Sequence, residues 1–291
     1  MNKKFACLHT HTVFCDGKDD VETMCRAAFE KGLSAIGFSS HAPMGETGLQ
    51  SFWHLKNERL GEYINEVTSA RRRWEGKLAV YLGLEVDYAQ GLRSASDKDI
   101  RDLNLDYIIG SVHYLVPKHG APFTVDGSDE ELEKGIAEGY NGDGGAMMHS
   151  YWDAVANMIA TGGFDIIGHL DLVKKKNRSN RWFNPESDDY KHRTAEITRA
   201  ISENGIVVEV NTGAMNRGVH TEPFPSLEIL RLLRQYNVPV MINADAHRAN
   251  DLDGNYPVAC QTIIDAGYTS HVTFEGRKDG KPIWQEREMR N

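Results

Sequence analysis

Two histidines near the start of the chain have the spacing of a pair of metal ligands. The apolar segment Phe5–Leu8 is typical of a short strand, and it runs into His9-Thr10-His11. In an extended chain, residues two apart point to the same side, so both imidazoles can reach one cation. The pair alone is weak evidence, because 12 histidines in 291 residues produce about 0.5 such pairs by chance.

The same residue types recur after other strand-like segments. In chain order they are His9 and His11, His41, Glu85 and Asp87, His113, His169 and Asp171, and Asp245 and His247. Each one alone could be an ordinary polar residue at the start of a loop. In a parallel barrel, however, the carboxyl ends of the strands converge on one face, where active sites are built. Together these residues therefore predict one shared site.

Short apolar, β-branched runs alternate with longer segments of helical periodicity along the chain. The candidate strands are Phe5–Leu8, Ala35–Phe38, Leu78–Leu84, Asp106–Val112, Asp165–Ile167, Ile206–Val210, Val238–Ile242 and His271–Phe274. Alternation over seven or eight such units predicts an α/β fold with a closed parallel barrel.

Two of the intervening helices have clear boundary signals. Asp19 and Glu22 are spaced as a capping box, and Gly32 is a stop signal. The apolar residues of that helix are Val21, Met24, Cys25, Ala28 and Phe29. A second helix is expected after Pro225-Ser226, with an apolar stripe of Leu227, Leu230 and Leu233.

The widest interruption of the pattern spans residues 117–163. It is partly Gly-rich, at Gly139, Gly142, Gly144 and Gly145, and is predicted to be helical from Tyr151 to Ile159. We interpret it as a loop-plus-helix excursion over the barrel mouth, within a single domain covering residues 1–291.

The bulk composition excludes several classes of protein. With 40% hydrophobic and 26% charged residues, the chain has the composition of an ordinary globular protein. No apolar run approaches the roughly 20 residues that span a bilayer, and no signal peptide is evident, so a cytoplasmic location is expected. A net charge of -9 argues against a nucleic-acid polymer as partner but not against a small anionic substrate.

The residue types of the shared site also select the cofactor. Imidazoles with carboxylates and no thiolate suit zinc, manganese or iron, whereas calcium prefers oxygen ligands throughout. The ligands are too many for one four-coordinate ion, so two or three divalent ions with a bridging carboxylate are expected. Such a cluster suits hydrolysis of a phosphate ester, which mainly demands positioning and charge neutralisation.

The motifs, taken in order, resemble the PHP (polymerase and histidinol phosphatase) family. They are His9-Thr10-His11, Asp16-Gly17, His41, Glu85, His113, His169 and Asp245-Ala246-His247. The resemblance runs from residue 9 to residue 247. It implies a distorted (β/α)7 TIM-like barrel with a trinuclear metal site at the carboxyl ends of the strands. One of the eight candidate strands would then be an extra.

The resemblance also implies which residues hold each metal ion. For the first, second and third ion in turn they are His9, His11, Glu85 and Asp245; Glu85, His113 and His169; and Asp16, His41 and His247. Glu85 would bridge the first two ions, with a hydroxide between them as the nucleophile. Asp245 or His247 would handle the protons of the nucleophile and of the leaving alkoxide, and both remain candidates.

Four stretches resemble the histidinol-phosphate phosphatase branch of the family. They are Gly83–Tyr88, Gly110–His113, Phe123–Gly127 and Ile167–Lys175. The branch implies a phosphoric monoester hydrolase that converts L-histidinol phosphate to L-histidinol and phosphate in histidine biosynthesis.

A phosphate monoester brings negative charge, so cations are expected beside the metal ions. Arg217 follows the sixth candidate strand on a polar, Gly-containing loop, and an arginine can grip phosphate with two donors. Lys174 and Lys175 follow His169. They are either phosphate ligands or part of a solvated run of charges with Lys176.

Two alternatives remain. A PHP hydrolase could act on a nucleotide, a cyclic phosphodiester or a phosphotyrosine peptide. A metal-storing or structural barrel would need every coordination position filled by protein. Three protein ligands per ion leave a position for water, which is the catalytic pattern.

Overall fold

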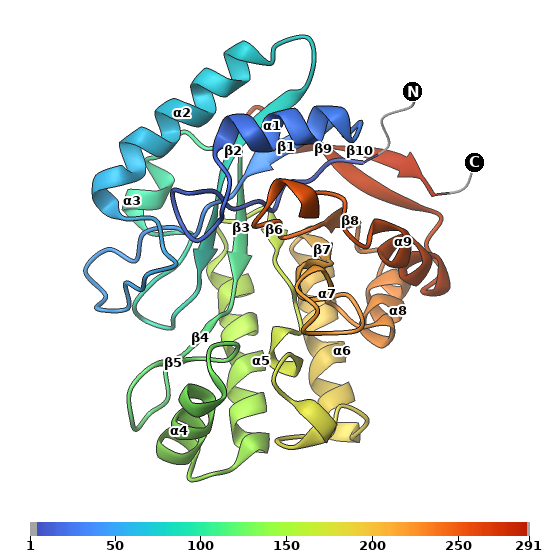
Figure 1. Cartoon of the computed structure of the whole chain (residues 1–291). Coiled ribbons are helices and arrows are strands. Elements are labelled where there is room, and N and C mark those ends of the chain that lie inside the picture. The colour runs from blue at the N-terminus through green and yellow to red at the C-terminus, as the bar shows by residue number, and fades with distance from the viewer. Residues whose placement is uncertain (1–4, 290–291) are drawn as a thin grey trace.

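A curved parallel sheet forms the centre of the computed structural model, which describes residues 5–289 (Figure 1). Its strand order is β1-β2-β3-β6-β7-β8, and every neighbouring pair is parallel. The strands are β1 (Ala35–Phe38), β2 (Ala79–Asp87), β3 (Tyr107–Ser111), β6 (Ile166–Ile167), β7 (Val207–Asn211) and β8 (Val240–Asn243).

The chain segment before β1 closes this sheet into a barrel. Cys7 forms a parallel bridge with Ile36 of β1, and Thr10 forms one with Ala246, just after β8. The Cys7 amide donates to the Ala35 carbonyl at 3.1 Å. The distorted (β/α)7 TIM-like barrel predicted from the sequence is therefore confirmed, although its first strand is short and irregular.

Helices connect the strands and cover the outside of the barrel. They are α1 (Val21–Glu30), α2 (Leu60–Arg73), α3 (Lys98–Arg101), α4 (Asp129–Tyr140), α5 (Gly144–Thr161), α6 (Asp188–Glu203), α7 (Gly213–Asn216), α8 (Leu227–Gln235) and α9 (Tyr256–Asp265). Short 3-10 turns are η1 (Asn57–Arg59), η2 (Leu172–Lys174), η3 (Arg178–Asn180) and η4 (Ala249–Asp251). The helix predicted after Ser226 is α8, which buries Leu230 and Leu233.

The start of α1 differs by one residue from the sequence prediction. Asp20, not Asp19, caps the helix, because its carboxylate accepts from the Thr23 amide at 2.7 Å. Asp19 instead accepts from the Ala249 amide at 2.8 Å and so ties the loop before α1 to the loop after β8. Phe29, expected on the apolar face, is 43% exposed.

The excursion at 117–163 is more helical than its glycines suggested. It contains all of α4 and all of α5, which lies beside α6 (Figure 1). The first residue of α5 is Gly144. A glycine is required there because a Cβ would lie 2.4 Å from the Trp182 carbonyl oxygen. The excursion also holds β5 (Phe123–Thr124), which pairs antiparallel with β4 (Tyr114–Leu115). That the whole chain forms one domain stays a prediction.

The last candidate strand is the extra one. It is β9 (Ser270–Lys278), which forms an antiparallel hairpin with β10 (Lys281–Glu288). Phe274 of β9 packs against side chains near the amino ends of the barrel strands, namely Leu8, Tyr107, Ile109, Ile166, Val207 and Met241. Arg277 also donates to the Asp165 carboxylate at 2.9 and 3.1 Å. The hairpin thus seals the end of the barrel opposite the predicted site.

No helix within residues 5–289 is long and apolar enough to cross a membrane.

We predict that Phe274→Ala lowers the free energy of unfolding by about 3–5 kcal/mol, because it leaves a cavity in this apolar seal. Urea unfolding measures the loss. Phe52→Ala is the matched control, since Phe52 is 90% exposed and should change stability by no more than about 0.5 kcal/mol. Equal effects of the two substitutions would contradict the role of Phe274.

Candidate metal centre

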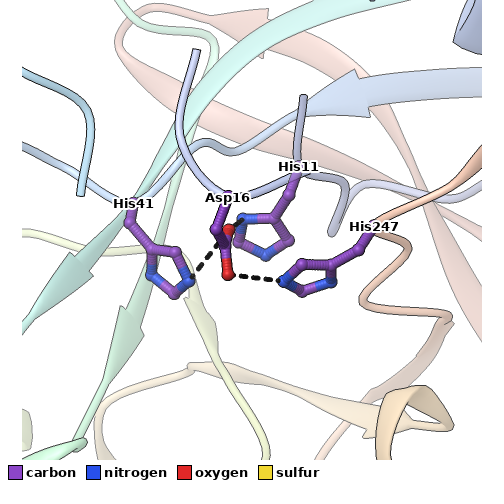
Figure 2. A group of neighbouring side chains, drawn as sticks. All are labelled: His11, Asp16, His41 and His247. Atoms are coloured by element: carbon purple, nitrogen blue, oxygen red, sulfur yellow. Dashed lines mark hydrogen bonds and ion pairs between the residues drawn. The ribbon is translucent and has the colours of Figure 1, made fainter. Parts of the chain in front are cut away.

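Four of the predicted ligands form one group at the carboxyl end of the barrel. Figure 2 shows His11, His41 and His247 arranged around the carboxylate of Asp16. Asp16 Oδ2 lies 3.1 Å from His247 Nε2, and Asp16 Oδ1 lies 3.9 Å from His41 Nε2. The group contains all three residues that the resemblance implies for the third ion.

A second group surrounds the two histidines of the first strand. His9 Nε2 lies 3.1 Å from Glu85 Oε2 and 3.7 Å from Asp245 Oδ1. His11 Nε2 lies 3.2 Å from Asp245 Oδ1 and 3.6 Å from Glu85 Oε2. Two imidazoles and two carboxylates therefore face one another, as implied for the first ion.

The other oxygen of Glu85 faces a third group. Glu85 Oε1 lies 3.0 Å from His169 Nε2 and 3.8 Å from His113 Nε2. It also accepts a hydrogen bond from Ser111 Oγ at 2.6 Å. One carboxylate is thus shared between two groups of donors, which is the arrangement of a bridging ligand.

The backbone around Asp245 is adapted to this position. Asp245 has a positive φ of 48°, which is uncommon for a residue with a side chain. Gly213 makes room for its carboxylate, because a Cβ there would lie 2.6 Å from Asp245 Oδ2. Such strain tends to occur at functional sites.

The donor atoms fit divalent cations. Several buried atoms have no hydrogen-bond partner among the described residues, and they include His9 Nε2, His11 Nε2, Asp16 Oδ1, His41 Nδ1 and Glu85 Oε2. Unpaired buried polar atoms are costly. Because all of these atoms belong to the three groups and lie close to other donors, bound metal ions would satisfy them.

The charges of the site support the same conclusion. Burial raises the pKa of Glu85, but His9 and His41 outweigh it and hold this pKa well below its usual range. Burial, together with His247 and His41, lowers the pKa of His11 to about 3. An ionised Glu85 and a neutral His11 are therefore in the forms that bind metals. Burial lowers the pKa values of His9, His41 and His113, but the nearby carboxylates outweigh it and raise them, so these rings would release protons when metal ions bind.

Asp87 orients His113 by contacting the ring nitrogen that faces away from Glu85. Its carboxylate lies 2.6 Å from His113 Nδ1 and 3.2 Å from His54 Nε2. Burial lowers the pKa of His113, but Asp87 and Glu85 raise it to about 10. The contact leaves His113 Nε2 directed at Glu85, as in carboxylate–histidine–metal triads.

Glu209 of β7 is a functional residue that the sequence analysis missed. It is fully buried, and both of its oxygens lie about 3 Å from His9 Nδ1, at 3.0 and 2.9 Å. It also accepts from the His169 amide at 2.8 Å and from the side chains of Asn211 and Asn243 at 2.7 and 3.0 Å. Glu209 therefore directs His9 Nε2 toward the centre and holds the backbone of His169.

The three predicted phosphate-binding cations lie in different places. Arg217 lines the same cavity as the donor groups and donates to Asp245 Oδ2 at 3.1 Å. Lys175 also lines this cavity and is paired with Asp126 at 2.7 Å. Lys174 does not line it, because Asp171 and Glu222 hold its ammonium at 3.3 and 2.7 Å. We therefore leave Lys174 out of the phosphate site.

The cavity has a volume of about 980 Å³, which is ample for a small phosphorylated molecule. Its wall includes ligands of all three groups, such as His41, His113 and Asp245. The rest of the wall includes Phe52 and Trp53 and, around β5 and the start of α4, Thr124, Asp126, Gly127, Ser128 and Glu131.

Comparisons with known proteins agree with this geometry. The family model of the PHP domain matches residues 8–213. A protein of Deinococcus radiodurans named "Probable histidinol-phosphatase" is 31% identical over 271 residues, which cover 93% of this chain and 96% of that protein. The histidinol-phosphatase of Bacillus subtilis is 25% identical over 264 residues, with 85% of this chain and 95% of that protein covered.

A solved structure shares the fold. The histidinol phosphate phosphatase of Lactococcus lactis, crystallised with zinc, L-histidinol and phosphate, superposes with a TM-score of 0.71 at 22% identity. The match covers 94% of this chain and 99% of that one.

We predict that Glu209→Gln weakens metal binding about 10- to 100-fold, because the loss of the carboxylate charge leaves His9 poorly oriented. Competition with a chromophoric chelator measures the affinity, and elemental analysis gives the metal content per chain. Glu275→Gln is the control, since Glu275 is exposed and pairs with Arg287 on the hairpin. Unchanged metal affinity in Glu209→Gln would contradict its positioning role.

Proposed function

Because the chain belongs to the PHP domain family, we propose that it is a metal-dependent phosphomonoesterase that hydrolyses L-histidinol phosphate to L-histidinol and phosphate. The observation that carries this proposal is the shared carboxylate of Glu85, which joins two groups of metal ligands at the wall of a substrate-sized cavity. Relatives of nearly the same length are named histidinol-phosphatases, which supports the choice of substrate.

The proposed cofactors are two or three divalent ions, zinc, manganese or iron. The residues that would hold them are His9, His11, Asp16, His41, Glu85, His113, His169, Asp245 and His247. Divalent ions held there would neutralise the phosphate charge and activate water as a nucleophile. Zinc in the Lactococcus lactis protein supports the first of the three metals.

Arg217 is the proposed phosphate clamp of the chain itself. Its guanidinium lies beside Asp245 and within 3.2 Å of His247 Nδ1, yet it also lines the cavity. It can therefore contact a phosphate oxygen while it fixes the Asp245 carboxylate. Lys175 adds a second positive charge farther along the wall.

Proton transfer is assigned to Asp245 rather than to His247. His247 Nδ1 lies 3.0 Å from the Asp245 carbonyl oxygen and Nε2 faces Asp16, so both ring nitrogens are engaged. Asp245 Oδ1 faces His11, whereas Oδ2 is held by Arg217 next to the cavity. A carboxylate oxygen has two acceptor sites, whereas a ring nitrogen has one. Asp245 Oδ2, which Arg217 occupies at one site only, would therefore still be able to take a proton from the attacking water and return it to the leaving alkoxide.

The substrate partner proposed here is a small phosphorylated molecule rather than a nucleic-acid polymer. A cytoplasmic location stays a prediction from the sequence.

We predict that kcat/KM for L-histidinol phosphate exceeds that for other phosphate esters by at least about a hundredfold. The panel includes p-nitrophenyl phosphate, nucleotides, a cyclic phosphodiester and a phosphotyrosine peptide. Activity should disappear on chelation and return with zinc or manganese, because the buried donor atoms need cations. Weak, even rates across the panel would contradict the substrate assignment but leave the metal centre intact.

We also predict that Arg217→Ala lowers kcat/KM about 10²- to 10³-fold, because both the phosphate clamp and the anchor of Asp245 are lost. Steady-state kinetics with metal-loaded enzyme measures the change. Lys176→Ala is the control, since Lys176 pairs with Asp129 and does not line the cavity. Similar losses in the two variants would argue against a specific role for Arg217.

A further inference from the structure

Three carboxylates that line the cavity, those of Asp126, Glu131 and Asp251, belong to none of the three metal groups. Asp126 follows β5 and lines the cavity together with His113 and His169. The Val125 amide donates to the His113 carbonyl at 2.9 Å, which joins the Asp126 segment directly to a metal ligand. Asp126 is therefore anchored beside the second metal position.

The segment that carries Asp126 is rigidly built. Glu131 Oε1 accepts from the amide and the hydroxyl of Thr124 at 2.8 and 2.9 Å. Gly127 must lack a side chain, because a Cβ would lie 2.2 Å from Thr124 Oγ1. Ser128 then caps α4 by accepting from the Glu131 amide at 3.1 Å. These contacts fix the backbone on both sides of Asp126.

The Asp126 carboxylate is ionised, and only one of its two oxygens has a hydrogen-bond partner among the described residues. Burial raises the pKa of its carboxyl, but Lys175 and His113 outweigh it and hold this pKa well below its usual range. Lys175 Nζ contacts Oδ2 at 2.7 Å, and it is the only hydrogen-bond partner of Asp126 within residues 5–289. A carboxylate has about four acceptor sites. The side chain is 20% exposed, so a ligand in the cavity can reach it.

We propose that Asp126 binds the ammonium group of the substrate and thereby selects phosphate esters of amino alcohols. The inference rests on the proposed function and names the residue that reads the substrate beyond its phosphate. In L-histidinol phosphate, the amine is on the carbon next to the ester carbon. With bonds of roughly 1.5 Å, the ammonium must lie close to the phosphate and therefore close to the metal groups.

Asp126 suits this role better than the other carboxylates of the cavity. Asp16 and Asp245 belong to the metal groups. Glu131 has one oxygen occupied by Thr124, and it is exposed at the start of α4. Asp251 lies in η4, four residues after His247, and within residues 5–289 its segment makes no backbone hydrogen bond to His113 of the kind that Val125 makes.

A purely structural role makes a different prediction. If Asp126 only held Lys175 in place to contact the phosphate, its loss would affect every phosphomonoester alike. If it binds the ammonium, its loss affects only substrates that carry one.

The test compares L-histidinol phosphate with 3-(imidazol-4-yl)propyl phosphate, which is the same ester with hydrogen in place of the amine. In the metal-loaded wild type, kcat/KM should favour the amine-bearing substrate by about ten- to a hundredfold, as expected for a charge-assisted hydrogen bond. In Asp126→Asn this ratio should fall to near one, mainly through KM. Asp129→Asn, at an exposed residue outside the cavity, should keep the wild-type ratio.

Each outcome bears on a separate claim. A ratio that Asp126→Asn leaves unchanged, even with lower overall rates, overturns the inference and identifies Asp126 as a structural anchor for Lys175. A wild type that hydrolyses the two esters equally well also overturns it, without affecting the proposed function if both are strongly preferred over p-nitrophenyl phosphate. Weak, even rates on all esters would overturn the proposed function itself.

Discussion

The barrel closes through the same residues that carry the predicted metal ligands. The His11 amide donates to the Ala246 carbonyl at 2.9 Å, and the Ala246 amide donates to the His9 carbonyl at 3.0 Å. This pair of hydrogen bonds joins the first strand to the segment after β8. It also sets His9 and His11 opposite Asp245 and His247. The seam of the barrel and the candidate metal centre therefore share the same residues.

That coupling explains how the chain accommodates so much buried charge. A buried carboxylate costs several kcal/mol unless it is compensated. Glu85 is compensated by the Ser111 hydroxyl and by ring nitrogens of residues that follow several different strands. Metal ions would tie these strands together at the carboxyl end. At the amino end, Phe274 and Arg277 of the hairpin do so by apolar packing and an ion pair. The two ends of the barrel are thus held by opposite kinds of interaction.

The same logic determines what the sequence could and could not predict. The ligands were recognisable because each follows an apolar run, where parallel strands deliver side chains to the active face. Glu209 lies inside a strand and was missed. Its signal was the alternation in β7, where Glu209 and Asn211 interrupt a buried run of valines that a parallel strand would otherwise make wholly apolar. Gly139 and Gly144 misled because both lie in helices, where close packing requires a glycine. A Cβ on Gly139 of α4 would lie 2.9 Å from Pro117, and one on Gly144, the first residue of α5, would lie 2.4 Å from the Trp182 carbonyl oxygen. Lys174 and Lys175 are adjacent in sequence, so the sequence could not tell which of them faces the cavity. Their ion-pair partners in the structure, Glu222 and Asp126, distinguish them.

The Lys175–Asp126 pair shows why a local charge count matters more than the net charge of -9. A free carboxylate beside His113 and His169 would compete with these rings for the metal ion that they are proposed to bind. Lys175 holds Asp126 Oδ2 and offsets its charge, so the carboxylate is kept as a hydrogen-bond acceptor at the wall. On the other side of the centre, Arg217 pairs with Asp245 and leaves a positive group at the cavity. An acidic protein can thereby present separate positive and negative positions, which is the charge pattern of a phosphate ester that also carries an ammonium group.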